Sequence, residues 1–158
     1  MGRLWPPYTA LAGAPDPLTA ISTQGARIRL ADGRELIDGV SSWWTACHGY
    51  NHPAIVAAMT EQLYRMPHIM FGGLSHDPAI ELADRLCKIL PGAPTRIFLS
   101  YSGSVAIEVA MKMAVQYWRN QGKPGRTRFI SFQGGYHGDT MAAMSVSDPE
   151  EGMHQMFA

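Results

Sequence analysis

The sequence predicts an α/β fold with a largely parallel sheet, and three observations carry this prediction. Two short apolar segments, 96–100 and 127–132, alternate with long helical patterns in the second half of the chain. A glycine-containing loop follows each apolar segment, and the first loop opens directly into a helix. The alternation of strand, loop and helix is typical of parallel sheets, in which ligands bind at the carboxyl ends of the strands.

The chain begins with a segment that has little periodicity. Residues 1–20 are rich in Pro, Ala and Gly, which favours an extended arm. The arm also carries Trp5 and Tyr8, which are unusual in a free tail. We therefore expect the arm to lie against another part of the protein.

A hairpin and a loop are expected next. In residues 26–39, apolar and polar residues alternate on both sides of Asp32 and Gly33, a pair that is strongly associated with hairpin turns. This pattern predicts two antiparallel strands. Residues 41–53 contain Gly, Asn and Pro, which favour a loop over a long helix.

Three helices are predicted, over residues 54–66, 77–90 and 104–120. Asp77 is expected to cap the second helix, and Pro78 suits its first turn. The third helix is apolar around most of its circumference, which predicts burial on several sides. The residues from 141 onward can begin a further helix that soon becomes irregular.

Composition narrows the class of protein. Thirteen basic residues balance thirteen acidic ones in a chain of 158 residues that is 46% hydrophobic, so nothing favours nucleic acid as a partner. Ten Met, four Trp and six Tyr fit a core, an interface or a ligand pocket. Cys47 and Cys87 lack metal-type spacing and are expected to be reduced thiols. No apolar segment has the length of a membrane span or the pattern of a signal peptide, and we expect a cytoplasmic protein.

Ser102, Gly103 and Ser104 stand where the predicted strand 96–100 meets the third helix. The simpler interpretation is a helix cap. The alternative is a phosphate site, because a helix N-terminus has unpaired N–H groups and small residues let an anion approach them. The segment matches neither the phosphate-binding loop of nucleotide hydrolases nor the G-x-S-x-G turn of serine hydrolases.

Two further loops carry aromatic and imidazole side chains. In "GGYHGD" (134–139), glycines surround Tyr136, which could lie flat on a planar cofactor, and His137, which could be catalytic or structural. "SSWWTACHGYNH" (41–52) places Trp43 and Trp44 on a loop, where they suit an apolar substrate pocket or an interface. Its two histidines, four residues apart, would have metal spacing only on a helix, so no metal site is predicted.

Taken together, six stretches resemble one family: "WPPYT", "DGVSSWW", "HGYNHP", "MPHIMFGG", "SGSVAIEVAMKMAVQYW" and "GGYHGDTMAAMSV". They are similar to the fold-type I, class III pyridoxal-phosphate aminotransferases. "WPPYT" and "SSWW" narrow the resemblance to the members that convert 8-amino-7-oxononanoate to 7,8-diaminononanoate for biotin synthesis, with S-adenosylmethionine as the usual amino donor. The resemblance implies that residues 1–50 are a small-domain part, and that 51–158 begin the large domain that binds pyridoxal 5'-phosphate.

The resemblance also implies roles for individual residues. Gly103 and Ser104 match the pair that holds the cofactor phosphate, and Tyr136 matches the aromatic residue that lies against the pyridine ring and borders the substrate. Trp43 and Tyr8 match residues that contact the oxononanoate. Trp44 and His137 stand beside these positions and are weaker candidates.

Other features of the family concern what this chain lacks. Its three lysines, Lys88, Lys112 and Lys123, do not stand in the context of the family's Schiff-base lysine, which is expected beyond Ala158. We therefore expect an N-terminal portion that is inactive alone and belongs to a homodimeric enzyme. The position before Ser102, commonly Asp in the family, is Tyr101 here.

Two alternatives remain open from the sequence. One is another class III enzyme that acts on an ω-amino acid or a diamine. The other is a non-catalytic short protein that binds a partner or a phosphorylated ligand.

Overall fold

The computed structural model describes residues 3–150 of the chain. They divide into two compact units at the junction of Ser75 and His76, and each unit is described by itself. The expected boundary near residue 50 concerns the domains of a larger protein, and it stays a prediction.

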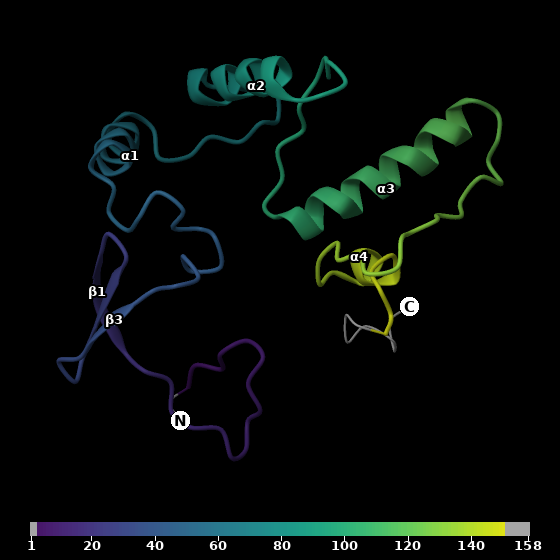
Figure 1. Ribbon diagram of the computed structural model, residues 1–158. Coiled ribbons are helices and arrows are strands. Elements are labelled where there is room, and N and C mark those ends of the chain that lie inside the picture. The colour runs from purple at the N-terminus through teal and green to yellow at the C-terminus, as the bar shows by residue number, and fades with distance from the viewer. Residues whose placement is uncertain (1–2, 151–158) are drawn as a thin grey trace. The chain divides into compact units, whose positions relative to one another are not determined.

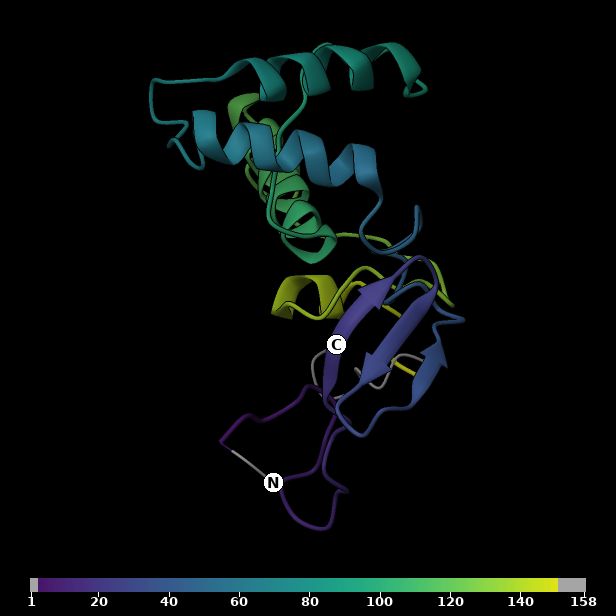
Figure 2. The same ribbon diagram turned by 90° about the vertical axis from the view of Figure 1, so that its left-hand side faces the viewer.

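The first unit contains an antiparallel sheet of three strands in the order β1 (Ala20–Gln24), β2 (Arg27–Leu30) and β3 (Glu35–Ile37), which lie side by side in Figure 2. The predicted hairpin is confirmed as β2 and β3, where Ile28 pairs with Leu36. Gly33 adopts a φ of 88° in the turn between them, a backbone conformation that suits glycine.

Strand β1 was not predicted, since residues 20–24 have no clear alternation of apolar and polar residues. It forms because Gly25, with a φ of 57°, turns the chain back so that β1 can pair with β2. Gly25 also exchanges two backbone hydrogen bonds with Tyr50, at 3.1 and 2.7 Å. The loop before the next helix is thereby attached to the turn between β1 and β2.

Helix α1 (Pro53–Arg65) completes the ordered elements of the first unit. Its bounds agree with the predicted helix 54–66 to within one residue. Proline at the start has no N–H to leave unpaired, and its fixed φ suits the first turn.

The second unit holds α2 (Asp77–Ile89), α3 (Gly103–Asn120) and α4 (Met141–Ser145), as Figure 1 shows. All three helices were predicted, but the prediction that Asp77 caps α2 was wrong. His76 caps the helix, since its Nδ1 accepts a hydrogen bond from the backbone N–H of Ala79 at 3.3 Å. Asp77 is the first helical residue, and its negative charge interacts favourably with the positive end of the helix dipole.

The two strands predicted over 96–100 and 127–132 are absent from the described chain. Both segments are irregular, and neither makes backbone hydrogen bonds to a neighbouring strand. Ile130 is 100% exposed and Phe132 is 87% exposed. A strand is stabilised by its partner, so an apolar segment of strand-like sequence stays unpaired when no neighbouring strand is present.

Few apolar side chains are buried in the described residues. Leu30 on β2 and Ala143 on α4 are the only buried apolar residues there, although 46% of the chain is hydrophobic. No residue of α3 is buried, which contradicts the burial on several sides that its composition predicted. The apolar faces of the helices therefore lack a cover within this part of the chain.

Candidate functional site

The N-terminus of α3 combines a helix cap with available N–H groups. Ser102 is the cap, since its Oγ accepts a hydrogen bond from the backbone N–H of Val105 at 3.2 Å. The N–H groups of Gly103 and Ser104 make no hydrogen bond to any residue in the described range. A Cβ added at Gly103 would meet no atom within 4 Å. The two interpretations of this segment are compatible, because the cap leaves two N–H groups and open space for an anion.

Tyr101 stands directly before this cap. Its side chain is 99% exposed, so the phenol does not fold back onto the first turn of α3. The departure from the family's usual aspartate therefore leaves the space beside Gly103 open.

The glycine-rich loop 134–139 reaches the same end of α3. Ser104 Oγ accepts a hydrogen bond from the backbone N–H of Asp139 at 3.2 Å. Gly138 has a φ of 119°, and a Cβ there would lie 2.0 Å from Ser104 Oγ and 2.7 Å from Ser104 Cα. Only glycine permits this approach. The structure thus joins Ser104 to the loop that carries Tyr136 and His137.

Tyr136 lies on this loop with its side chain 65% exposed. The pKa of its phenol is raised above the ordinary value, first by the partial burial and then by the hydrogen bond to the Asp139 carboxylate. The hydroxyl group is consequently neutral over a wider pH range than in a free tyrosine. A neutral, accessible ring so near the Ser104 contact is suited to packing against a planar ligand.

Glu108, on the second turn of α3, connects this helix to α4. Its Oε1 accepts a hydrogen bond from the backbone N–H of Ala142 at 2.9 Å. The nearby hydroxyl of Thr140 and then the Ala142 N–H lower the pKa of Glu108. Of these two groups, the Ala142 N–H forms the hydrogen bond, because Thr140 Oγ1 is buried and has no hydrogen-bond partner among the described residues. The contact fixes α4, which directly follows the loop.

Two residues that hold the loop were missed in the sequence, namely Ser147 and Asp148. Ser147 Oγ accepts a hydrogen bond from the backbone N–H of His137 at 3.0 Å. Asp148 Oδ2 accepts one from the N–H of Gly134 at 2.5 Å, and its own N–H donates to the carbonyl of Gly135 at 2.7 Å. In the sequence, "SVSDP" resembles an ordinary turn, and only the fold shows that both side chains are buried.

In the first unit, Tyr8 of the arm meets Trp43 of the 41–53 loop. Their ring centroids lie 5.8 Å apart and their planes cross at 61°, an edge-to-face arrangement. The expected contact of the arm with another part of the protein is confirmed at Tyr8, whereas Trp5 donates a hydrogen bond to Thr9 within the arm itself. Trp44 does not share this contact with Tyr8, and its side chain is 85% exposed.

Trp43 belongs to a left-handed turn. Residues 41–44 are four consecutive non-glycine residues with φ between 49° and 71°. The N–H of Ala46 donates to the carbonyl of Ser41 at 2.9 Å, and that of Trp44 donates to Val40 at 3.1 Å. Each L-residue in this conformation costs about 1–2 kcal/mol, and such strain clusters at functional sites.

Asp38 stabilises this strained turn. Its Oδ1 accepts the N–H of Val40 at 3.0 Å, while Oδ2 accepts the N–H of Ser42 at 2.7 Å and the hydroxyl of Tyr50 at 2.6 Å. The Tyr50 hydroxyl, followed by the Val40 N–H, lowers the pKa of Asp38. The same bond to Asp38 raises the pKa of Tyr50. A charged acceptor thus faces a neutral donor across the neutral pH range.

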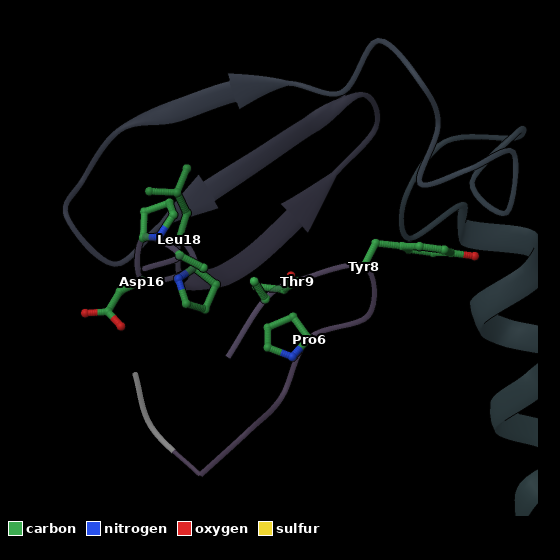
Figure 3. A pocket seen from close by; sticks show the side chains of 9 residues that line it. Pro6, Tyr8, Thr9, Asp16 and Leu18 are labelled. Carbon is green, nitrogen blue, oxygen red and sulfur yellow. The ribbon is translucent and has the colours of Figure 1, made fainter. Parts of the chain in front are cut away.

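Two open hollows lie beside these residues. The larger, of about 500 Å³, is lined by the arm, and Figure 3 shows the Tyr8 ring extending away from Asp16 and Leu18. All of its lining comes from this one segment, so we do not assign it to a substrate. The smaller, of about 360 Å³, is lined by Ile28, Asp38, Val40, Ser42 and Trp43, and it is the better substrate candidate because it adjoins the strained turn.

The predicted site residues form two groups, and each group lies within one unit. Tyr8 and Trp43 touch in the first unit, with Trp44 next in the chain. In the second unit Ser104 contacts the loop that carries the tyrosine and the histidine, and Gly103 precedes it. The two groups together comprise Tyr8, Trp43, Trp44, Gly103, Ser104, Tyr136 and His137.

The two histidines of the 41–53 loop lie near each other without forming a metal site. The His48 and His52 rings lie 6.4 Å apart, centre to centre. Residues 3–150 contain no group of three His, Cys, Asp or Glu side chains placed to hold a metal ion. Over the same range, no helix is both long enough and apolar enough to cross a bilayer.

Comparison with known proteins defines the class to which this fold and site belong. The family model for aminotransferase class III matches residues 10–158. The chain therefore belongs to the class III aminotransferase family. Its fold is that of the N-terminal part of a fold-type I enzyme, as predicted.

Several of the similar proteins carry the name of one particular enzyme within this family. The adenosylmethionine-8-amino-7-oxononanoate aminotransferase of Synechococcus elongatus is 54% identical over 146 residues, which are 92% of this chain and 34% of that protein. The crystal structure of the enzyme of the same name from Methanocaldococcus jannaschii has a TM-score of 0.90 at 36% identity, and the match covers 98% of this chain and 36% of that one. The crystal structure of a PLP-bound amine transaminase from an uncultivated Pseudomonas species has a TM-score of 0.86 at 34% identity. That match covers 98% of this chain and 35% of the transaminase. The chain thus spans about a third of the length of the proteins it matches.

The Asp38 contacts predict a pH-dependent effect of Asp38→Asn on stability. Because the folded pKa of Asp38 is lowered, the carboxylate stabilises the fold above its unfolded pKa, near 3.8, and this contribution is lost as pH falls through the folded pKa. We expect D38N to reduce the free energy of unfolding at pH 6–7, and the difference from the parent protein to shrink below pH 4. Chemical denaturation across pH measures this. If D38N remains equally destabilising down to pH 3, the stabilising role of the Asp38 carboxylate is contradicted. Asp84→Asn, at an exposed position of α2, is the control and should change the free energy of unfolding little at any pH.

The Gly138 contact predicts a steric effect of Gly138→Ala. The new Cβ would overlap Ser104, whose atoms belong partly to the backbone of α3, so relief requires the loop to move. We expect G138A to lower the free energy of unfolding by about 3 kcal/mol. Gly122→Ala is a matched control, since Gly122 also has a positive φ but open space around it, and it should cost about 1 kcal/mol. Equal effects of the two substitutions would show that the overlap has no consequence.

Proposed function

We propose that these residues form the N-terminal part of a pyridoxal-phosphate-dependent aminotransferase that converts 8-amino-7-oxononanoate to 7,8-diaminononanoate in biotin synthesis, with S-adenosylmethionine as amino donor. The names of the relatives in Synechococcus and Methanocaldococcus support the substrates. The observation that carries the proposal is the α3 N-terminus, where Gly103 and Ser104 offer N–H groups beside the loop of Tyr136.

The residues present fit pyridoxal phosphate. The free N–H groups and open space at Gly103 and Ser104 suit a phosphate, and the Ser104 hydroxyl can donate to it while accepting from Asp139. The Tyr136 ring would pack against the pyridine ring. When bound, the cofactor supplies the electron sink that amino-group transfer requires.

Trp43 and Tyr8 would form part of the substrate pocket. Their edge-to-face contact offers an apolar surface for the hydrocarbon chain of the oxononanoate, and Tyr8 adds a hydroxyl group. The left-handed turn fixes the direction in which Trp43 projects. Trp44 follows Trp43 in the chain and His137 follows Tyr136, and we propose both as secondary contacts.

The described residues do not provide the lysine that transamination needs. Lys88 lies on α2, Lys112 lies on α3, and Lys123 lies in the turn after α3 with its Nζ 5.4 Å from the centre of the Trp118 ring. None of them stands at the open end of α3. We therefore propose that the chain of 158 residues is inactive alone, and that the active enzyme is a cytoplasmic homodimer of a longer chain.

The test is an assay of the complete protein. We expect the complete reading frame to bind pyridoxal phosphate, to change its visible spectrum with S-adenosylmethionine, and to form 7,8-diaminononanoate that mass spectrometry detects. Faster conversion of ω-amino acids or diamines, with Trp43→Ser leaving oxononanoate use unchanged, would favour the other class III activity. Turnover by the 158 residues alone, or a complete protein that binds no cofactor, contradicts the proposal.

Ser104→Ala tests the phosphate site directly. The substitution removes one hydrogen bond to a charged group and should raise the dissociation constant for pyridoxal phosphate about tenfold, as measured by absorbance titration. Ser22→Ala, on exposed strand β1, is the control and should leave the constant unchanged. An unaltered constant in S104A would place the phosphate elsewhere.

A further inference from the structure

A buried carboxylate lies behind the loop of Tyr136. Asp148 is only 3% exposed, and Ser147 beside it is equally buried. Burial of a charged group is costly unless hydrogen bonds compensate for the lost water. Here Asp148 Oδ2 accepts the N–H of Gly134, and Oδ1 accepts the N–H of Glu150 at 2.8 Å. None of the roles assigned above to the cofactor or substrate site uses this carboxylate.

These contacts hold the loop along its length. Asp148 fixes its start through the N–H of Gly134 and the carbonyl of Gly135. Ser147 accepts the N–H of His137 and donates to the carbonyl of Ala143 on α4, at 2.8 Å. Tyr136 lies between the residues that are held in this way.

The far end of the loop is fixed separately. Ser104 accepts the N–H of Asp139, and the approach of Gly138 leaves no space between the loop and α3. The backbone on both sides of Tyr136 is therefore anchored, at one end to α3 and at the other to the segment after α4. The position of the Tyr136 ring depends on both anchors.

We propose that Asp148, together with Ser147, is a positioning residue that sets the Tyr136 ring against the cofactor. The inference rests on the proposed function, because it assumes that Tyr136 packs on pyridoxal phosphate. Asp148 binds the backbone of the loop at Gly134 and Gly135, and we infer that it acts on the cofactor through Tyr136, the next residue of the loop. The N–H groups of Gly134 and Glu150 bind different oxygens of the carboxylate, and an asparagine in the same position would offer an acceptor to only one of them.

Asp148→Asn is the informative substitution. Asparagine has the same shape, but an NH₂ group replaces one acceptor and faces a backbone N–H. In the complete protein without cofactor, we expect faster hydrogen exchange at Gly134 and His137 and no loss of helical circular dichroism. Asp84→Asn makes the same chemical change at an exposed position of α2. It should alter neither the hydrogen exchange of the loop nor the circular dichroism.

The decisive measurement is a double-mutant cycle with Tyr136→Ala. We expect D148N to raise the dissociation constant for pyridoxal phosphate about tenfold in the parent protein and less than twofold in the Y136A background, since coupled residues are not additive. The circular dichroism that the protein induces in the bound cofactor should fall in D148N and not in D84N. A tenfold effect in both backgrounds, or none in the parent, overturns the inference.

The outcomes separate this inference from the proposed function. If the unaltered complete protein binds no pyridoxal phosphate, the proposed function fails and the inference fails with it. If it binds the cofactor but the cycle is additive, the inference alone fails. If D148N does not fold, Ser147→Ala is carried through the same cycle, because it removes the acceptor of the His137 N–H and leaves the carboxylate in place.

Discussion

The contact between Gly138 and Ser104 is the constraint on which the proposed cofactor site depends. A helix N-terminus offers N–H groups to an anion wherever it is exposed, so α3 by itself specifies little. The Gly138 approach places a second loop on this helix end, with Ser104 Oγ accepting the N–H of Asp139. One serine can then take part in phosphate binding and in holding the aromatic loop. In the proposed site, affinity for the phosphate and placement of the Tyr136 ring would be coupled through this one side chain.

The left-handed turn at Trp43 has a strained backbone that hydrogen bonds to Asp38 stabilise. Four left-handed residues in succession are unfavourable for L-amino acids, and no glycine relieves them. Asp38 compensates through two backbone N–H groups and the hydroxyl of Tyr50, and the loop is further attached where Tyr50 pairs with Gly25. The strain is confined to the segment that projects the tryptophans. Both candidate sites thus use a carboxylate to organise a loop that carries an aromatic ring, Asp38 in one unit and Asp148 in the other.

The two exposed apolar segments of the second unit do not form the strands that their sequence predicts. The strands expected over 96–100 and 127–132 have apolar sequences but no partners, and α3 buries no residue. The chain spans about a third of the length of its relatives, such as 34% of the Synechococcus protein. Sheet formation is a cooperative property of neighbouring strands, whereas helices form from local hydrogen bonds. This difference explains why the predicted helices are present and the predicted parallel strands are not.

The sequence by itself determined the helices, the β2–β3 hairpin and the family, because these follow from local patterns and from short motifs. The residues that it assigned to the two candidate sites stay a prediction. Only the tertiary structure showed strand β1, the His76 cap, the left-handed turn at Trp43, and the hydrogen bonds of Asp38, Ser147 and Asp148. Each of these depends on hydrogen bonds whose geometry, or on burial whose extent, no sequence pattern specifies. A buried aspartate in "SVSDP" and an exposed one in a surface turn have the same sequence appearance, and only packing distinguishes them.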